Sequence, residues 1–554
     1  MYEMKVLSSL IKVFSEEEPI EDLGMTNFSM FKNETFSFQI AYTKKEYFNE
    51  YVKVEVESDI KQCIRLREVI LVPSRYPIHT HLPHDDYYLK TKPGMFPDLL
   101  RDLDDSKIQL VSYQWHSLWV DIEPCQDIKP GNHLIKFSLI NLEDQEICSV
   151  ETNVMIYPHK LLENKLIHTE WFHGDCIANY YGEEVFSERH WQLMENFIEI
   201  AVKRQCNMIL TPIFTPPLDT VKGGERTTIQ LIDIEVTPDG YCFNFDKFRR
   251  WVVMCQKVGM KYFELSHLFT QWGAIATPKI MAIKEGRYQR IFGWETPATS
   301  REYKVFLEQF LPTLIKEIKA LNIQENTYFH ISDEPELLQY ESYKAAKEIV
   351  APYLKDFKII DAMSSYGFYE LGVIDHPICA TNHIQTFIDH KVKNMWSYYC
   401  TAQYNKVCNR FMAMPSARNR AYGLQLFKYD IEGILHWGYN FYNSQYSVYP
   451  INPYFDTDAS MAFPSGDPFL VYPGANGKPE ESIRIMVQNQ AINDLRALIL
   501  LAKYLGKKKT IELMEEGIEP ITFENYPHND LYYVKLRNKV NQLIHEYVVN
   551  EYGR

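Results

Sequence analysis

The sequence predicts an α/β fold in which an N-terminal β-sandwich precedes a (β/α)8 TIM barrel and a C-terminal helical extension follows. Three observations support this class. Apolar and polar residues alternate in short runs early in the chain, short apolar runs alternate with amphipathic segments in the middle, and the end has helical periodicity. We expect the sandwich over residues 1–162, the barrel over 163–505 and the helical tail over 506–554.

The N-terminal region is predicted to be β because turn residues separate its alternating runs. The expected strands are 36–43, 51–58, 115–124, 133–141 and 152–158. Between them, residues 74–98 form a long polar connection that contains a His/Asp cluster: His79, His81, His84, Asp85 and Asp86. No zinc-motif spacing is present, so a hydrogen-bonded loop that docks onto the barrel is favoured over a metal site.

The barrel is predicted from eight apolar runs with amphipathic segments, such as 188–205 and 303–322, between them. The candidate strands are 167–173, 207–212, 262–267, 327–332, 358–363, 378–383, 395–400 and 433–439. The connections 213–244 and 268–300 are long and rich in Gly, Pro, Thr and Trp. Long loops of this kind usually build the active site at the C-terminal face of a barrel. After a Pro/Gly/Asp-rich loop, helices are expected over 484–506 and 529–549.

Composition excludes several classes of partner. The 554 residues carry a formal net charge of −15 without a Lys/Arg-rich block, which disfavours nucleic acids and anionic membranes. No stretch is long and apolar enough for membrane insertion, and the first residues do not resemble a signal peptide. The 10 Cys are scattered without a CxxC pair. Buried free thiols and a cytoplasmic location are therefore expected, although a trimmed secreted form has the same features.

The most informative stretch is YFHISDEPE (328–336), which places Asp333 and Glu334 at the end of the fourth candidate strand. That end of a barrel strand carries catalytic residues. The alternative is a surface Asp-Glu pair at the start of a helix, where acidic residues and Pro335 are favoured. His330 and Ser332 precede the pair at alternate positions, which simple packing explains poorly.

An adjacent Asp-Glu pair fits one variant of glycoside hydrolysis. Most such enzymes use two separated carboxyl groups, yet the seventh candidate strand offers none. In the substrate-assisted variant the 2-acetamido oxygen of the sugar attacks its own anomeric carbon. Asp333 would then stabilise the acetamido group, and Glu334 would protonate the leaving oxygen and later activate water. The ordinary route, with Asp361 or Asp175 as the second group, stays open.

A series of motifs makes the sequence resemble glycoside hydrolase family 123. They are WFHGDCIANYY (171–181), TPIFTPPLDT (211–220), GERTT (224–228), FELSHLFTQWGAIATPKI (263–280), FGWET (292–296), HISDEP (330–335), DIEGILHWGYNFY (430–442), GDPFLVYPG (466–474) and SIR (482–484). The resemblance covers about 165 to 485 and implies an exo-acting, retaining β-N-acetylgalactosaminidase without a cofactor or metal. It also implies the two roles given above for Asp333 and Glu334.

Further candidate substrate-binding residues are predicted from their positions at strand ends and in the long connection 268–300. Trp437 is the expected stacking platform under the sugar ring, with a core Trp that caps the barrel as the alternative. Gln271 and Trp272 are expected to contact sugar hydroxyls, with loop scaffolding as the alternative. Tyr398 or Asn382 is expected to hold the acetamido carbonyl, with an ordinary hydrogen-bonded polar residue as the alternative. The remaining candidates are Trp171, His173, Asp175 and His330. For these, an ordinary hydrogen-bonded polar residue is the competing interpretation.

The expected partner is an oligosaccharide or glycoconjugate with a terminal β-linked GalNAc, and GlcNAc is the second choice. Two other functions stay open. One is a hydrolase of a different sugar that uses two carboxylates, which would not need the 2-acetamido group. The other is a catalytically silent carbohydrate-binding protein, which would bind GalNAc without turnover.

Overall fold

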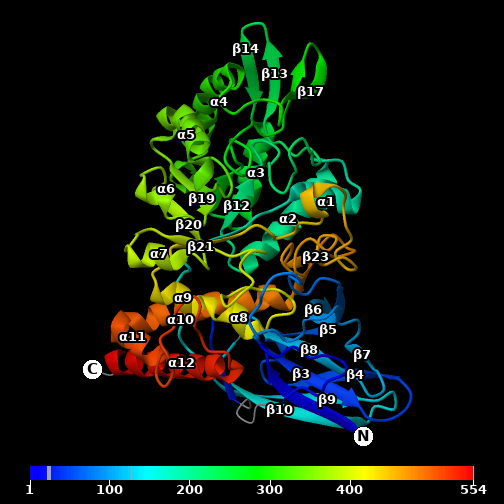
Figure 1. Ribbon diagram of the computed structural model, residues 1–554. Helices are drawn as coiled ribbons and strands as arrows, with labels where there is room; N and C mark the ends of the chain where they lie inside the picture. Colours follow the sequence, from blue (N-terminus) through cyan, green and yellow to red (C-terminus); the bar gives the residue numbers. More distant parts are fainter. Residues whose placement is uncertain (21–26, 127, 553–554) are drawn as a thin grey trace.

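The computed structural model describes residues 1–20, 27–126 and 128–552 (Figure 1). Sheets from the N-terminal region lie at one end of the molecule, and the chain rises from them into a barrel. The helices α10 (Ile483–Leu505), α11 (Lys507–Met514) and α12 (Asp530–Tyr552) lie beside these sheets. The predicted mixed α/β class is therefore confirmed.

Eight parallel strands form a closed barrel in sequence order, and the last strand pairs with the first. The strands are β11 (Ile167–Glu170), β12 (Met208–Thr211), β15 (Tyr262–Leu265), β18 (Thr327–Phe329), β19 (Lys358–Met363), β20 (His376–Ala380), β21 (Trp396–Tyr398) and β22 (Gly433–His436). Each of the eight predicted runs overlaps one of them. Alternate residues of a strand, such as Ile360 and Ala362 or Ile378 and Ala380, belong to one buried cluster, as the period of two requires.

Helices separate every pair of successive barrel strands. They are α1 (Gly174–Tyr181), α2 (Glu188–Lys203), α3 (Asp246–Lys257), α4 (Arg301–Ala320), α5 (Tyr340–Leu354), α6 (Gly367–Glu370), α7 (Ile384–Asp389), α8 (Ser416–Arg420) and α9 (Tyr422–Lys428). Ser187 and Ser300 cap α2 and α4 by accepting hydrogen bonds from backbone N–H groups of the first turn. Both helices overlap the amphipathic segments predicted over 188–205 and 303–322.

The two long connections contain structure that the sequence did not suggest. The hairpins β13 (Asp233–Thr237)–β14 (Gly240–Asn244) and β16 (Ile280–Lys284)–β17 (Arg287–Phe292) join into a four-stranded sheet. In Figure 1 this sheet projects from the barrel at the end far from the termini. Glu285 and Gly286, both with positive φ, form the two-residue turn of the second hairpin.

The N-terminal region contains two sheets. The seven-stranded sheet has the order β1-β3-β8-β5-β6-β24-β23, and the five-stranded sheet has the order β2-β10-β9-β4-β7. The strands are β1 (Tyr2–Ser8), β2 (Asn27–Phe31), β3 (Phe36–Lys44), β4 (Glu50–Glu57), β5 (Ile64–Ser74), β6 (Gly94–Asp102), β7 (Lys107–Leu110), β8 (Trp115–Ile122), β9 (Gly131–Ile140), β10 (Glu146–Tyr157), β23 (Val471–Pro473) and β24 (Pro479–Ser482). Phe38 of one sheet and Phe137 of the other belong to one hydrophobic core.

Two strands of the seven-stranded sheet come from beyond the last barrel strand. Glu481 of β24 pairs with Leu100 of β6, and β23 pairs with β24 at the sheet edge. Helix α10 starts directly after β24 and packs on α8, α9 and α12. The N-terminal sheet, the barrel and the C-terminal helices are therefore connected by one segment.

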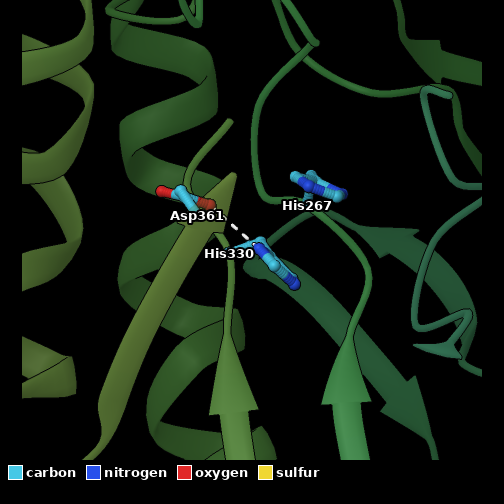
Figure 2. Close-up of side chains that lie close together, drawn as sticks. All are labelled: His267, His330 and Asp361. Atoms are coloured by element: carbon cyan, nitrogen blue, oxygen red, sulfur yellow. Dashed lines mark hydrogen bonds and ion pairs between the residues drawn. The ribbon is translucent and has the colours of Figure 1, made fainter. Parts of the chain in front are cut away.

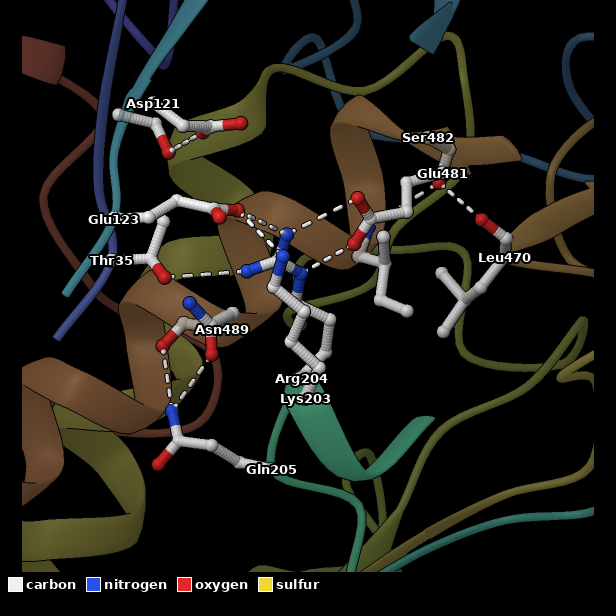
Figure 3. Close-up of polar contacts among 12 residues, drawn as sticks. Thr35, Asp121, Glu123, Lys203, Arg204, Gln205, Leu470, Glu481, Ser482 and Asn489 are labelled. Atoms are coloured by element: carbon white, nitrogen blue, oxygen red, sulfur yellow. Dashed lines mark hydrogen bonds and ion pairs between the residues drawn. The ribbon is translucent and has the colours of Figure 1, made fainter. Parts of the chain in front are cut away.

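A buried ionic network lies at this connection (Figure 3). Glu481 accepts hydrogen bonds from Arg204, which follows α2, and from Arg67 of β5 at 2.7 Å. Arg67 also donates to Asp121 of β8 at 2.6 Å. The side chains of these four residues are at most 2% exposed, so the charges neutralise one another away from water.

The expectation of buried free thiols holds for Cys176, Cys206, Cys255, Cys379 and Cys408, whereas Cys148 and Cys400 are free but only partly buried. It is wrong for the other three cysteines. Cys63 and Cys125 form a disulfide bond, and Cys242 is an exposed free thiol. Cysteines 62 positions apart give no sequence signal of contact, because only the fold brings Cys63, directly before β5, close to Cys125 in the loop after β8. Among helices in the described ranges, none is long and apolar enough to span a bilayer.

Candidate active site

The Asp333–Glu334 pair lies in a tight turn after β18. Glu334 has φ +41°, in the left-handed region that non-glycine residues rarely adopt, and such strain is common at functional sites. The connection 268–300 holds the turn in place. Trp272 N–H donates to the Asp333 carbonyl at 2.8 Å, and Ser332 Oγ donates to the Thr270 carbonyl at 2.8 Å.

The pair faces a pocket of about 170 Å³. Seven of the predicted site residues line it: Asp333, Glu334, Trp171, Gln271, Trp272, Tyr398 and Trp437. The other lining residues are Leu218, Asp219, Ala362, Cys400, Thr401, Leu435 and Phe463. The pocket is therefore a concave, largely apolar site with a few convergent carboxyl groups, as ligand sites usually are.

Glu334 is arranged to hold a proton. Burial raises the pKa of its carboxyl group, and the negative charge of Asp467 acts in the same direction. Tyr398 opposes this shift because its O–H donates to Glu334 Oε1 at 2.6 Å and so favours the ionised form. Burial and the neighbouring Glu334 likewise raise the pKa of Asp333. Two adjacent carboxyl groups that share a partly buried pocket favour one shared proton.

Two tryptophans in the pocket wall are fixed through their indole nitrogens. Trp437 Nε1–H donates to Asp467 Oδ2 at 2.9 Å, and Phe441 and Phe463 contact its ring edge-on. Trp171 Nε1–H donates to Glu264 Oε1 at 2.8 Å. Each ring thereby has one set orientation at the pocket, which suits stacking against a sugar face.

Gln271 ties two loops together. Its Oε1 accepts from the Asp219 backbone N–H at 2.9 Å, and its Nε2 donates to the Thr220 carbonyl at 3.1 Å. Both ends of the amide are therefore engaged with the connection 213–244. This loop supplies Asp219, a pocket carboxylate that sequence reasoning missed although TPPLDT was already part of the family motif.

Asp219 has an unusual environment. It has φ +45°, and its Oδ2 accepts from the Tyr446 backbone N–H at 2.9 Å. Burial raises the pKa of Asp219, whereas Arg226 and the backbone hydrogen bonds lower it. Burial has the larger effect, and the resulting pKa is about 6. The only available signal was an acidic residue after two prolines in a long loop, which does not by itself indicate a pocket.

Four predicted site residues lie outside the pocket lining. Asp175 forms a buried two-point ion pair with Arg226, and Arg226 also donates to His173 Nδ1. His173 Nε2–H is then left to donate to the Trp437 carbonyl at 2.8 Å. Asn382 is exposed and accepts a hydrogen bond from Gln403 at 2.9 Å. His330, the fourth, is fully buried beneath the pocket.

A cluster of His267, His330 and Asp361 has ligand atoms within 4.8 Å of one another (Figure 2). The imidazole rings are stacked, with centroids 4.3 Å apart and planes at 23°. A metal ion lies in the plane of each imidazole that binds it, and two stacked rings cannot both meet that condition. Both ring nitrogens of His330 also face carboxylate oxygens. The geometry of this cluster does not fit a metal site.

Two members of the His/Asp cluster, His79 and Asp85, make the predicted docking contacts, whereas His81, His84 and Asp86 are exposed. Asp85 accepts from the guanidinium group of Arg418 in α8, and His79 bonds to the Thr401 carbonyl at 2.8 Å. These contacts dock the connection onto the barrel beside the pocket, because Thr401 lines it.

Residues 171–501, more than half of the chain, match the family model described as glycoside hydrolase 123, catalytic domain. The chain belongs to glycoside hydrolase family 123. This confirms the resemblance found in the sequence and identifies the protein as a glycoside hydrolase by family. Among curated protein sequences, none matches the chain.

Solved structures agree with the family. A family 123 glycoside hydrolase from Clostridium perfringens, analysed for the details of glycolipid glycan hydrolysis, superposes with a TM-score of 0.77 at 15% identity, over 100% of both chains. At this identity the likeness establishes the fold. An endo-β-1,4-mannanase from Thermotoga petrophila reaches a TM-score of 0.33 at 10% identity, over 60% of this chain and 77% of that chain. A likeness of that size carries no further conclusion.

Proposed function

We propose that this family 123 protein removes terminal β-linked N-acetylgalactosamine with retention of configuration, and that the 2-acetamido group of the substrate is the nucleophile. Asp333 binds the acetamido N–H and stabilises the positive charge that develops there. Glu334 donates its proton to the leaving oxygen and then takes a proton from water. The observation that carries the proposal is the adjacent Asp-Glu pair at the pocket.

The alternative second carboxylates fit less well. Asp175 is neutralised by Arg226, and Asp361 is occupied by His330, Tyr343 and a backbone N–H. Both are at most 1% exposed, and neither lines the pocket. Asp219 does line it and is the remaining candidate for an ordinary nucleophile or base.

The glycan of a glycolipid is a reasonable substrate class, by analogy with the protein from Clostridium perfringens. The preference for GalNAc over GlcNAc depends on one hydroxyl orientation, and the polar groups of the pocket determine it. We also propose the domain division inferred from sequence: a sandwich over 1–162, a TIM barrel over 163–505 and a helical tail over 506–554. The helix between every two barrel strands supports the TIM assignment.

The test is hydrolysis of 4-nitrophenyl β-N-acetylgalactosaminide beside the β-GlcNAc and β-galactoside analogues. We expect turnover of acetamido sugars only, and NMR of the first product should show the β-anomer. Glu334→Gln and Asp333→Asn should each lower kcat/KM by about 10²-fold or more, since each removes a group needed in the transition state.

Two controls sharpen this test. Glu341→Gln removes an exposed carboxylate at the start of α5 and should leave kcat/KM unchanged. Asp219→Asn should retain more activity than Asp333→Asn. Turnover of the plain galactoside, or complete loss of activity in Asp219→Asn alone, would overturn the substrate-assisted route. GalNAc binding without turnover of any glycoside would favour the silent binding protein.

A further inference from the structure

A buried imidazole connects three neighbouring barrel strands beneath the pocket. His330, just after β18, lies between Glu264 of β15 and Asp361 of β19, and all three side chains are 0% exposed. Its Nε2 is 2.5 Å from Glu264 Oε1 and its Nδ1 is 2.9 Å from Asp361 Oδ1. Figure 2 shows the contact with Asp361 at the strand ends.

The hydrogen-bond inventory indicates which form of His330 is present. Ionised carboxylates only accept hydrogen bonds, so two such contacts require an N–H on each ring nitrogen, which is the imidazolium form. Glu264 and Asp361 are occupied on their other sides by donors, namely Thr169 Oγ1 and Trp171 Nε1 for Glu264, and Tyr343 O–H and Ile331 N–H for Asp361. Burial opposes the charge, but the two carboxylates raise the pKa of His330 to about 10.

The remaining neighbours of His330 are two rings that carry no positive charge. His267, from the loop after β15, stacks on its face, and burial together with the charge of His330 keeps the pKa of His267 well below its ordinary value. Trp171 approaches edge-on, with ring centroids 6.2 Å apart. The titratable groups around His330 are thus two carboxylates, a neutral imidazole and, through Asp361, the Tyr343 hydroxyl.

Two parts of the pocket depend on this arrangement. Trp171 lines the pocket and donates to the same Glu264 oxygen that faces His330, so the imidazolium fixes the acceptor that orients the indole. Asp333 lies three residues after His330. The His330 charge lowers the pKa of Asp333, whereas Glu264 and Asp361 raise it.

We propose that His330 is a positioning residue: a permanent cation between Glu264 and Asp361 that orients Trp171 in the pocket wall and offsets part of the negative charge facing Asp333. It touches neither substrate nor reacting atoms. With His330 protonated the three side chains carry a net charge of −1, and without its proton they would carry −2 beside Asp333. The role at Asp333 rests on the proposed function, whereas the charge state of His330 does not.

The first experiment is the pH profile of kcat/KM for His330→Gln. Glutamine keeps an N–H donor but no charge, so the acidic limb should move to higher pH by about one unit and kcat should fall about tenfold. Tyr343→Phe is the matched control: it removes a neutral donor to Asp361 and leaves the cation in place. Tyr343→Phe should lower Tm without moving the acidic limb of kcat/KM. If the role of His330 is purely structural, His330→Gln should do the same.

The second experiment needs no activity. Nitrogen-15 NMR of the 17 histidines in the wild-type chain should reveal one ring with both nitrogens protonated from about pH 5 to pH 9. An unmoved acidic limb in active His330→Gln, or only neutral imidazoles at pH 8, overturns the inference. If wild type hydrolyses no glycoside, the proposed function fails while NMR still decides the charge of His330.

Discussion

The acid form of Glu334 is set by a balance of burial, which favours the proton, and the Tyr398 hydrogen bond, which favours its loss. In Tyr398→Phe this bond is lost and the pKa of Glu334 rises. Because the acid must be protonated to act, the alkaline limb of kcat/KM should move to higher pH. A pH–rate series with 4-nitrophenyl β-N-acetylgalactosaminide measures the limb.

Tyr399→Phe is the control for this substitution, because the buried Tyr399 hydroxyl does not act on the Glu334 carboxyl group. The alkaline limb of kcat/KM for Tyr399→Phe should lie at the same pH as that of the wild type. A limb that moves to lower pH in Tyr398→Phe would contradict the assignment of Glu334 as the acid.

Asp219 gives a stability prediction with a definite sign. Its folded pKa of about 6 lies above the ordinary value of 3.8, so ionisation costs folding free energy as pH rises from about 4 to 6. Asp219→Asn removes this cost, and we expect it to be more stable than wild type by about 2 kcal/mol at pH 7 and equally stable near pH 4. Urea unfolding of both proteins at the two pH values measures the difference. The prediction is contradicted if the stability of Asp219→Asn relative to wild type is lower at pH 7 than at pH 4.

Individual site residues were predictable to different degrees. Asp333 and Glu334 could be predicted because the motif that contains them lies at the end of a strand that the sequence itself reveals. Asp219, Thr401 and Phe463 come from separate loops, and only the folded barrel brings them to one pocket. The depth of His330 was hidden because alternation along a strand does not tell whether a side chain reaches the pocket or the interior beneath it.

Element prediction succeeded where burial leaves a pattern. Most barrel strands are rich in apolar residues because they are covered on both faces, although β11 reads IHTE. In contrast, β17 is mostly exposed and reads RYQRIF, and β23 has only three residues. The exposed β17 has too few buried positions, and the fully buried β23 is too short, to show a period of two, so the sequence predicts both as loop.

The packing of α9 on α10 depends on a glycine. A Cβ at Gly423 would overlap the backbone carbonyl of Ala491 in α10. Gly423→Ala should therefore force the helices apart and lower stability by about 1–3 kcal/mol, measured as Tm. At Gly94, where β6 begins, a Cβ meets nothing within 4 Å, so Gly94→Ala is the control and should leave Tm nearly unchanged. Equal Tm values for both variants would contradict close α9–α10 contact.

At the scale of the whole molecule, Glu481 holds the sheets and the barrel together. Although burial opposes ionisation, Arg204 and Arg67 keep the pKa of Glu481 well below its ordinary value. Its contribution to stability is therefore present above about pH 4.5 and is lost on acidification. Glu481→Gln leaves two buried arginines without their shared partner and should cost about 3–5 kcal/mol at pH 7 in denaturant unfolding.

Glu188→Gln is the comparison for this substitution, because Glu188 pairs with Arg250 on the surface with 83% of its side chain exposed. Exposed pairs contribute about 0–1 kcal/mol. If both variants lose the same small amount, the buried network is not a major link between the sheets and the barrel.

Thiol chemistry bears on where the protein resides. Eight cysteines are free and two form the Cys63–Cys125 disulfide, so alkylation of the denatured, unreduced chain should modify eight residues, and ten after reduction. Ten modified residues without reduction would support the cytoplasmic location proposed from sequence. Eight would favour an oxidising compartment, since disulfides are rare in the cytosol.

The pairing of β24 with β6 also constrains how the chain can be made. During synthesis the first 160 residues emerge long before Glu481, so β6 has an open edge while the whole barrel is being translated. Unpaired edges are prone to join other chains, and Arg101 and Asp102 at the end of β6 place charges that discourage this. Final closure of the N-terminal sheet must therefore follow synthesis of the barrel, and a separately produced N-terminal fragment would retain that open edge.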